Sequence, residues 1–390
     1  MSQRASRSRR GGRRSSTTRV VLASFLLVGP GPGPWLGCAG APPFPVADAW
    51  TDFPGDARSV AAERRILLDR AEEASRSIRE SGGVYEDDAL TSYLDGVVAR
   101  LVPDSLPESV PRPHAVVVLS PVRSAFVLPN GSIYVSSELL ASLENEAGLA
   151  SVLGHEIAHY VRRHALVEAL YANHSTSTVD RMKLSRKHER EADRMALELM
   201  SERGYDPSEM IRVLRLVAKD EVVDPGRVYA WESHPAARER IRDLKGDLWA
   251  GPWRTYGDDG DDRYGTAVAD LLLANAQLEL DEGHLDRARA SIDRHLAQRP
   301  QSGRGYYLRA EYERLTLEDG RFAPEVLAGY ERAHALAPDD PKIDRALGFL
   351  LEELGATGRA RPILESYLAL VPDAPDRKLV ERYLAEALGP

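Results

Sequence analysis

The spacing of apolar and polar positions predicts two helices followed by a small sheet. Across residues 57–79 apolar side chains recur at helical intervals among arginines and glutamates, and residues 90–101 repeat that pattern. The period then becomes that of β-strands at 115–119 and 132–135, which flank a further apolar run and a Pro-Asn-Gly turn at 129–131. We therefore expect two amphipathic helices and then a small antiparallel sheet.

Helical sequence resumes near Ser137 and continues almost unbroken to Leu244. A polar stretch rich in glycine and aspartate, residues 251–265, interrupts it and is typical of a linker. The pattern thus predicts one α+β, predominantly α, domain over residues 58–250 and an all-α region over residues 266–390.

The all-α region contains a repeat with a period near 34 residues. Three prolines close apolar helices at intervals of 38 and 34 residues, an alanine or valine precedes each proline by twelve positions, and glycines mark the turns between paired helices. This pattern resembles tetratricopeptide repeats, with residues 376–388 as a capping helix, although unrelated helical hairpins are the alternative. The residues are Pro300, Pro338 and Pro372; Ala288, Val326 and Ala360; and Gly283, Gly320 and Gly355.

The amino-terminal 37 residues have the order of a signal peptide. An arginine-rich start is followed by nine residues, 20–28, that are mostly apolar, then by a Gly-Pro repeat and Cys38. The apolar run is much shorter than the about 20 residues that span a bilayer. The arrangement resembles a bacterial lipoprotein signal, in which cleavage leaves Cys38 as an acylated amino terminus; a plain secretory signal is the alternative. Residues 38–57 would then form a flexible tether.

Composition and charge exclude several classes of protein. The formal net charge is −9, but residues 1–19 hold seven arginines and the first acid is Asp48, so the chain without that segment carries −9 − 7 = −16. A body this acidic argues against nucleic-acid binding, which requires Lys and Arg to neutralise phosphates. The single cysteine, Cys38, excludes a disulfide scaffold.

A metal-binding motif lies in the long helical stretch. His155 and His159 are four residues apart, so a helix places both imidazoles on one face within reach of one ion, with Glu156 beside them. Zinc prefers such nitrogen ligands, and a catalytic zinc site adds a third protein ligand and leaves one position for water. The motif predicts one Zn²⁺ per chain with Glu156 as the catalytic base.

The third ligand is predicted from a helical hairpin. We expect the helix that carries the histidines to continue through Tyr171, to turn at residues 173–178 and to return as a second helix. Because residue 174 is the midpoint between His159 and Glu189, the hairpin brings Glu189 level with the histidines. Asp193, one turn further, would orient a zinc-bound imidazole. The alternative is a solvated acidic face paired with neighbouring basic residues.

Four motifs in order strengthen this interpretation: Ser124 to Val135, the histidine motif, residues 185–193 with a following Gly-Tyr-Asp-Pro, and Ser-His-Pro at 233–235 followed by Arg240. Together they resemble the zinc endopeptidase family of the CAAX prenyl proteases, HtpX and BepA, over about residues 58–245. BepA-like members also carry C-terminal tetratricopeptide repeats.

The resemblance implies a gluzincin-type metallopeptidase domain with His155, His159 and Glu189 as zinc ligands, Glu156 as base and Asp193 behind the ligands. It also implies that His234 approaches the zinc from a loop and that Arg240 lies near the reacting groups; a surface histidine is the alternative for His234.

The expected function is a zinc-dependent endopeptidase of the bacterial cell envelope that degrades misfolded or stalled proteins. The substrate would be unfolded polypeptide, the repeats would bind a protein partner, and the lipid on Cys38 would attach the protein to a membrane on its periplasmic face, with the outer membrane preferred. The alternative is a chaperone-like assembly factor that binds through its repeats and has a closed zinc site; His234 as a fourth ligand would favour it.

Overall fold

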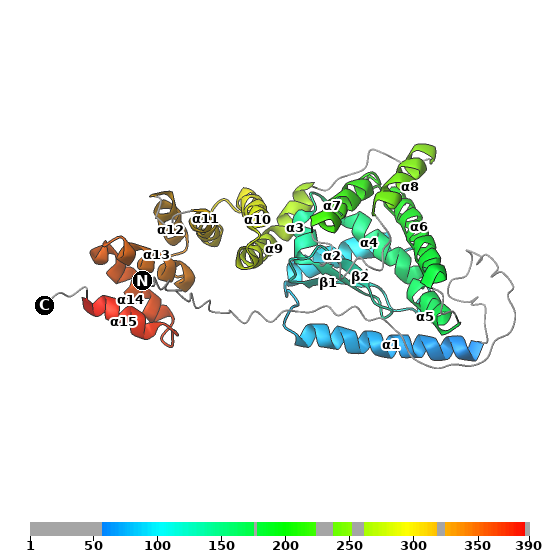
Figure 1. Cartoon of the computed structure of the whole chain (residues 1–390), viewed down its shortest axis with the longest axis horizontal. Helices are drawn as coiled ribbons and strands as arrows, with labels where there is room; N and C mark the ends of the chain where they lie inside the picture. The colour runs from blue at the N-terminus through cyan, green and yellow to red at the C-terminus, as the bar shows by residue number, and fades with distance from the viewer. Residues whose placement is uncertain (1–56, 175–177, 224–236, 252–260, 318–323, 387–390) are drawn as a thin grey trace, which may run out of the picture.

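The computed structural model describes residues 57–174, 178–223, 237–251, 261–317 and 324–386 of the 390. Within these residues the chain is predominantly helical with one small sheet, as predicted. The sheet-containing part lies at one end of an elongated molecule, and helical pairs extend from it (Figure 1). The predicted signal peptide, the tether with Cys38, and His234 lie outside the described residues.

The sheet contains three strands in the order β1-β3-β2, with β2 at an edge. The β2–β3 hairpin is antiparallel, but β1 pairs with β3 in parallel, with His114 opposite Ser132. The prediction of a wholly antiparallel sheet is therefore wrong for the pairing of β1 with β3. The reason is topological: β2 returns along the far edge, so β3 enters between β2 and β1 in the direction of β1. The strands are β1 (His114–Val118), β2 (Ala125–Val127) and β3 (Ser132–Ser136).

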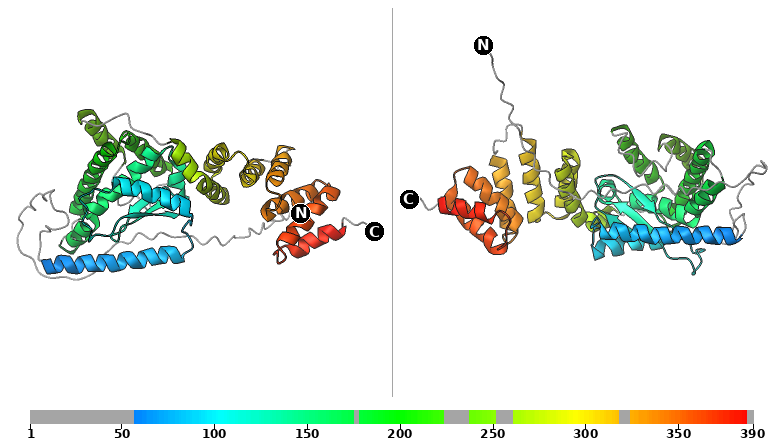
Figure 2. Two further views of the ribbon diagram at one scale, coloured as in Figure 1. Left: turned by 180° about the vertical axis from the view of Figure 1, so that it is seen from behind. Right: turned by 60° about the horizontal axis from the view of Figure 1, so that its bottom comes forward.

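Helix α4 is the centre of the sheet-containing part, because almost all of its residues are buried. It begins where Asn145 Oδ1 accepts the backbone N–H of Gly148 at 2.7 Å, an N-cap interaction. Helix α6 packs along it, and a Cβ added at Gly154 would lie 3.6 Å from Ala196 Cβ. The long helix α1 runs beneath the sheet (Figures 1 and 2). The first eight helices are α1 (Ala57–Glu80), α2 (Asp88–Leu101), α3 (Ser137–Ser142), α4 (Glu146–Val161), α5 (His164–His174), α6 (Thr178–Glu202), α7 (Glu209–Val223) and α8 (Ala237–Ala250).

The helix predicted to run unbroken from the histidine motif to Tyr171 is interrupted after α4. Arg163 has a φ of 55°, in the left-handed region that ends helices, and α5 begins at the next residue. Neither glycine nor proline occurs at this position, so the sequence carried no signal for the break. α5 ends at His174 and α6 begins at Thr178, as the predicted turn requires, and residues 175–177 of that turn lie outside the described residues.

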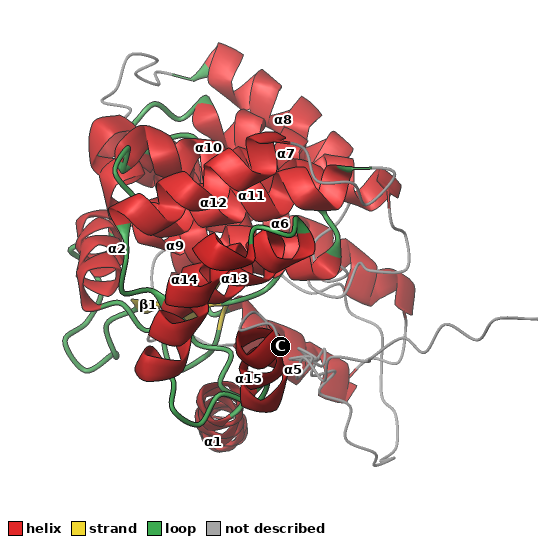
Figure 3. Ribbon diagram, turned by 90° about the vertical axis from the view of Figure 1, so that its left-hand side faces the viewer, coloured by secondary structure: helices red, strands yellow, loops and turns green. Residues whose placement is uncertain are grey.

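Six of the seven helices that follow form three successive pairs that extend away from the sheet, and the seventh packs on the last pair (Figure 1); Figure 3 views the molecule from that end. Gly283 and Gly355 have φ values of 79° and 71° where a first helix of a pair ends, a conformation that favours glycine. Helix α9 begins inside the stretch expected to be a linker, and its Tyr264 and Val268 are buried in the core of the sheet-containing part. The helices are α9 (Asp261–Glu282), α10 (Leu285–Gln298), α11 (Gly303–Thr316), α12 (Pro324–Leu336), α13 (Pro341–Glu353), α14 (Thr357–Leu370) and α15 (Arg377–Glu386).

A buried polar cluster joins α9 to α3 of the sheet-containing part. The side-chain amide of Asn275 donates to Glu138 Oε2 at 2.9 Å, and Ser137 Oγ donates to Asn275 Oδ1 at 2.8 Å. Glu279, fully buried, lies in the same cluster. Its burial and the neighbouring carboxylate of Glu138 raise the pKa of Glu279 to about 8. The folded protein therefore holds a proton here that the unfolded chain releases at lower pH.

This proton makes the stability of the junction depend on pH. Because the folded state binds more protons than the unfolded state between the ordinary carboxyl pKa and about 8, the free energy of unfolding should fall as pH rises through that window. We expect Glu279→Gln to remove this decline and to raise the melting temperature at pH 8. Thermal melts at pH 5.5 and 8 check this, with exposed Asp270→Asn on the same helix as control. An equal pH dependence in the parent and Glu279→Gln would contradict it.

Candidate metal centre

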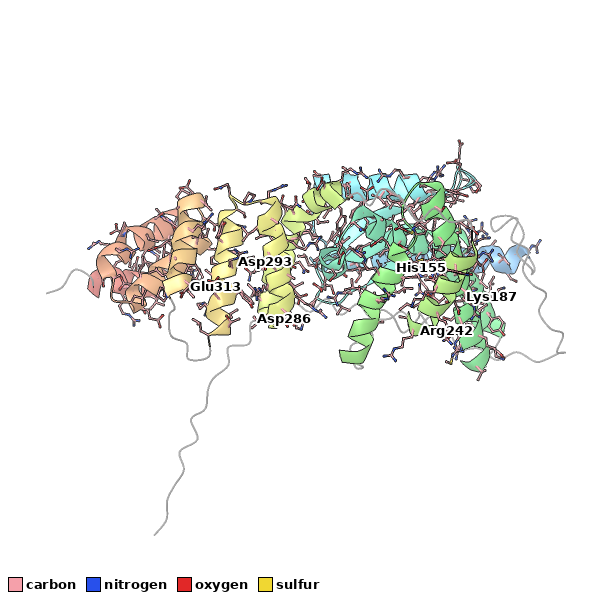
Figure 4. The ribbon with its side chains drawn as sticks, turned by 90° about the horizontal axis from the view of Figure 1, so that it is seen from above. His155, Lys187, Arg242, Asp286, Asp293 and Glu313 are labelled. Carbon is pink, nitrogen blue, oxygen red and sulfur yellow. The ribbon has the colours of Figure 1, made fainter. Side chains whose placement is uncertain are left out.

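Three side chains from two helices form a candidate metal site. The Nε2 atoms of His155 and His159 on α4 are 3.1 Å apart, because four residues make about one helical turn. Glu189 on α6 faces both, with its carboxylate oxygens 3.5 Å from His155 Nε2 and 3.3 Å from His159 Nε2. One potential ligand atom from each residue lies within 4.8 Å of the others. Figure 4 labels His155 among the helices, near α6 with Lys187 and α8 with Arg242.

Asp193 and Arg240 support two of these side chains from behind. His155 Nδ1 lies 3.1 Å from Asp193 Oδ1, so its second ring nitrogen faces a carboxylate. Arg240 on α8 donates to both oxygens of Asp193, at 2.5 and 2.9 Å, and its Nη1 lies 3.0 Å from Glu189 Oε2. All three groups are nearly inaccessible to solvent. The structure thus places Arg240 as a bridge between two buried carboxylates.

The charges of this cluster shift the pKa values of its members. Burial opposes ionisation of Asp193, but the Arg240 guanidinium and hydrogen bonds lower its pKa to about 2. Burial lowers the pKa of Arg240 and the two carboxylates raise it, with a net rise above the ordinary value. Burial and Arg240 also lower the pKa of His155, but hydrogen bonds with Asp193 and Glu189 outweigh them and raise it to about 9. Burial holds the pKa of His159 well below its ordinary value.

The second nitrogen of His159 meets another histidine. Its Nδ1 lies 3.0 Å from Nδ1 of His164, the first residue of α5. The ring of His164 stacks on that of His188 from α6, with centroids 4.1 Å apart and an interplanar angle of 8°. Sequence reasoning missed both residues. The recurrence of histidine at 155, 159, 164 and 188 indicated a histidine cluster. It did not show that His164 meets His159, because that contact depends on the break at Arg163.

A cavity of about 220 Å³ opens beside the candidate ligands. Glu156, His159 and Glu189 contribute to its wall. The remaining wall comes from α1, from the segment before β1, from edge strand β2 and its turn, and from the end of α4 and the start of α5. These residues are Arg64, Leu67, Leu68, Pro111, Phe126, Val127, Leu128, Pro129, Tyr160, Arg163, His164, Ala165, Leu166 and Glu168. The cavity is therefore mostly apolar, with the polar groups of the histidine motif at one side.

The structure brings together most of the residues singled out in the sequence. His155, Glu156, His159, Glu189, Asp193 and Arg240 all lie at this centre. Glu191, between Glu189 and Asp193 in sequence, instead lies 3.8 Å from Arg162 Nε and 3.8 Å from His164 Nε2. Arg240 was expected near the reacting groups; it lies behind the candidate ligands and is absent from the wall of the described cavity. His234 lies outside the described residues.

The donor set fits a transition-metal ion, and zinc in particular. Two imidazoles and one carboxylate are the protein ligands of hydrolytic zinc sites, which keep another position for water. Each candidate imidazole also has a partner at its other nitrogen, as metal-binding histidines generally do. A buried helix with the motif His-Glu-x-x-His, a glutamate from a second helix and an adjacent cleft define a centre of the metallopeptidase class.

The comparison with known families gives this class a name. Residues 88–179 and 172–247 match the family model described as Peptidase family M48. Residues 88–247 therefore match a family of metalloproteases, as the resemblance in their motifs indicated.

Individual relatives each match a part of the chain. Mitochondrial metalloendopeptidase OMA1 of Saccharomyces cerevisiae is 32% identical over 154 residues, 33% of this chain and 45% of the relative. The beta-barrel assembly-enhancing protease of Escherichia coli is 27% identical over 207 residues, 44% of this chain and 41% of the relative. The protein of that name from Yersinia pestis is 26% identical over 262 residues, 58% of this chain and 52% of the relative. The chain thus spans about half or less of the length of these relatives.

Proposed function

We propose that this protein is a zinc-dependent endopeptidase that hydrolyses unfolded or misassembled polypeptides. The observation that carries the proposal is the position of Glu156. This carboxylate lines the cavity next to the cluster of His155, His159 and Glu189, the three candidate metal ligands. Hydrolysis of a peptide bond needs a base beside an activated water, and this arrangement places a carboxylate where a base is required.

The residues of the candidate metal centre have separate roles in the proposed reaction. His155, His159 and Glu189 would hold the zinc ion, which when bound supplies the Lewis acidity that activates water and polarises the scissile carbonyl. Glu156 takes the proton from the attacking water and passes it to the leaving amine. Asp193 orients His155, and Arg240 holds Asp193 and Glu189 in place. Arg240 therefore has a positioning role in this mechanism.

The edge strand favours an extended substrate. β2 pairs only with β3 in the described sheet, so its other side can accept a polypeptide as an added strand, and Phe126 and Val127 of β2 line the cleft. Main-chain hydrogen bonds read little sequence, which suits a protease that recognises unfolded chains. The apolar wall from Leu67 and Leu68 of α1 would receive apolar side chains exposed in such chains.

The proposed location in the cell rests on the amino-terminal signal-like segment, and the proposed partner binding rests on the helical pairs near the carboxyl end. The resemblance of residues 1–38 to a lipoprotein signal supports export and a lipid anchor on Cys38, facing the periplasm, with the outer membrane as the expected site. Among the described helices, none is long and apolar enough to cross a membrane. The stacked helical pairs support a tetratricopeptide-like array that binds a protein partner. Two relatives are named beta-barrel assembly-enhancing protease, and this name supports the proposal that the present protein acts on misassembled envelope proteins.

Removal and return of the metal tests the proposal. We expect the purified protein to cleave unfolded casein, to lose this activity when a chelator removes the metal, and to regain it on addition of one equivalent of zinc, because the activated water depends on the ion. Fluorescent casein and metal analysis measure both quantities. Activity that persists in fully metal-free protein would overturn the zinc mechanism; zinc binding without cleavage of any unfolded substrate would favour the chaperone-like alternative.

A further inference from the structure

The two histidines of the centre have different partners at their second ring nitrogens. His155 faces the carboxylate of Asp193, whereas His159 faces another imidazole, that of His164, at 3.0 Å between Nδ1 atoms. His164 is 3% exposed and therefore shielded from water that could compete for this contact. The contact is also edge-on, with ring centroids 4.8 Å apart and an interplanar angle of 83°, so a nitrogen rather than a ring face of one residue meets the other.

The break between α4 and α5 creates this contact. In an unbroken helix, residues five apart point about 140° away from each other and do not meet. Arg163 adopts the left-handed conformation, φ 55°, which ends α4 and redirects the chain so that the first residue of α5 turns back toward His159. A conformation that is unfavourable for arginine is thus used at Arg163, the second of the two residues that separate α4 from α5.

His164 is itself held on two sides. Its ring lies flat on that of His188, and His188 Nδ1 is fixed 2.9 Å from Glu168 Oε1. On the other side, His164 Nε2 faces Glu191 Oε2 at 3.8 Å. These neighbours come from α5 and α6, so the ring orientation of His164 is set in part by α6, the helix that also carries Glu189.

We propose that His164 is a positioning residue for His159. His159 turns Nε2 toward Glu189 and His155, so its Nδ1 carries the proton when Nε2 serves as a ligand. His164 Nδ1 accepts that N–H, which fixes the ring orientation and the tautomer of His159, and the proton of His164 then lies on Nε2, toward Glu191. The centre is thereby built asymmetrically, with a carboxylate behind one imidazole and an imidazole behind the other.

This inference rests on the proposed metal site, and a metal-binding measurement tests it without reference to proteolysis. We expect His164→Leu to weaken zinc binding about ten- to hundred-fold in chelator competition, the usual loss when a partner of a metal-bound histidine is removed. The visible spectrum of the cobalt-loaded protein should shift as well, since an unrestrained imidazole changes the ligand geometry. His164→Asn, whose Oδ1 can take the place of Nδ1 as acceptor, should restore both quantities to near the parent values.

His114→Leu provides the matched control, because His114 is an exposed histidine of β1 outside the wall of the described cavity; this variant should bind zinc nearly as the parent does. Circular dichroism confirms folding, and His164→Ala is the second acceptor-free variant if the leucine variant does not fold. Parent-like zinc affinity and an unchanged cobalt spectrum in a folded acceptor-free variant would overturn the inference and leave the proposed function intact. A parent protein that binds no zinc would overturn the proposed function itself.

Discussion

Replacement of Glu156 by glutamine is expected to lower peptide hydrolysis by about 10²- to 10⁴-fold, the contribution of a well-placed general acid–base group. Glutamine has nearly the same shape but cannot accept the proton of the attacking water or return it to the leaving amine. The variant should still bind one zinc ion, because Glu156 is not among the three candidate ligands. Rates of casein cleavage and zinc content, measured on the same preparation, check both parts.

The control for Glu156→Gln is Glu198→Gln on α6, which changes a half-exposed carboxylate that pairs only with nearby Arg194 among its described ion pairs. This variant should cleave casein at the parent rate. A Glu156→Gln protein that is loaded with zinc and still cleaves casein normally would disprove the assigned base. Loss of zinc from Glu156→Gln would show that the carboxylate helps to hold the metal.

Replacement of Arg240 by methionine should produce the second large effect, on stability. Its guanidinium lies between Glu189 and Asp193, and all three side chains are at most 6% exposed. Methionine fills similar space but leaves two buried carboxylates without their shared cation, and such a loss destabilises proteins by about 3–5 kcal/mol. Chemical unfolding of the metal-free protein, followed by circular dichroism, measures the change.

Two variants bracket the Arg240 prediction. Arg240→Lys keeps the charge but not the planar fork that contacts both carboxylates, so we expect an intermediate loss. Arg242→Met removes an exposed arginine of the same helix and should change the free energy of unfolding by less than about 0.5 kcal/mol. Equal stability of Arg240→Met and the parent would show that the bridge contributes nothing to the fold.

Much of the site could be predicted because its chemistry is local in sequence. The four-residue interval between His155 and His159 fixes their common face in any helix. The hairpin argument predicted that Glu189 returns to their level, and the structure places it there even though α4 and α5 are separate helices. Glu189 lies level with the histidines because α6 packs directly along α4. The break at Arg163 therefore did not change which segments face each other.

Other features depended on contacts that leave no periodic pattern. The parallel pairing of β1 and β3 follows from the order in which the chain visits three neighbouring positions, whereas alternation shows only that a segment is a strand. The burial of Tyr264 in the peptidase core was hidden because its surroundings are polar and resemble a linker. The role of His164 depends on one backbone angle at Arg163, where no glycine or proline signals a break.

Residue type and short spacing were enough to predict the predominantly helical class, the strands, the paired helices near the carboxyl end and the residues able to bind a metal. Four other features became apparent only in the folded structure. They are the mixed sheet, the docking of α9 on the sheet-containing part, the bridge formed by Arg240 and the imidazole of His164 behind His159. These features join segments that are distant in sequence, or that a single left-handed residue redirects. Their geometry is set by packing and by the pairing of buried polar groups, which become defined only when the whole domain folds.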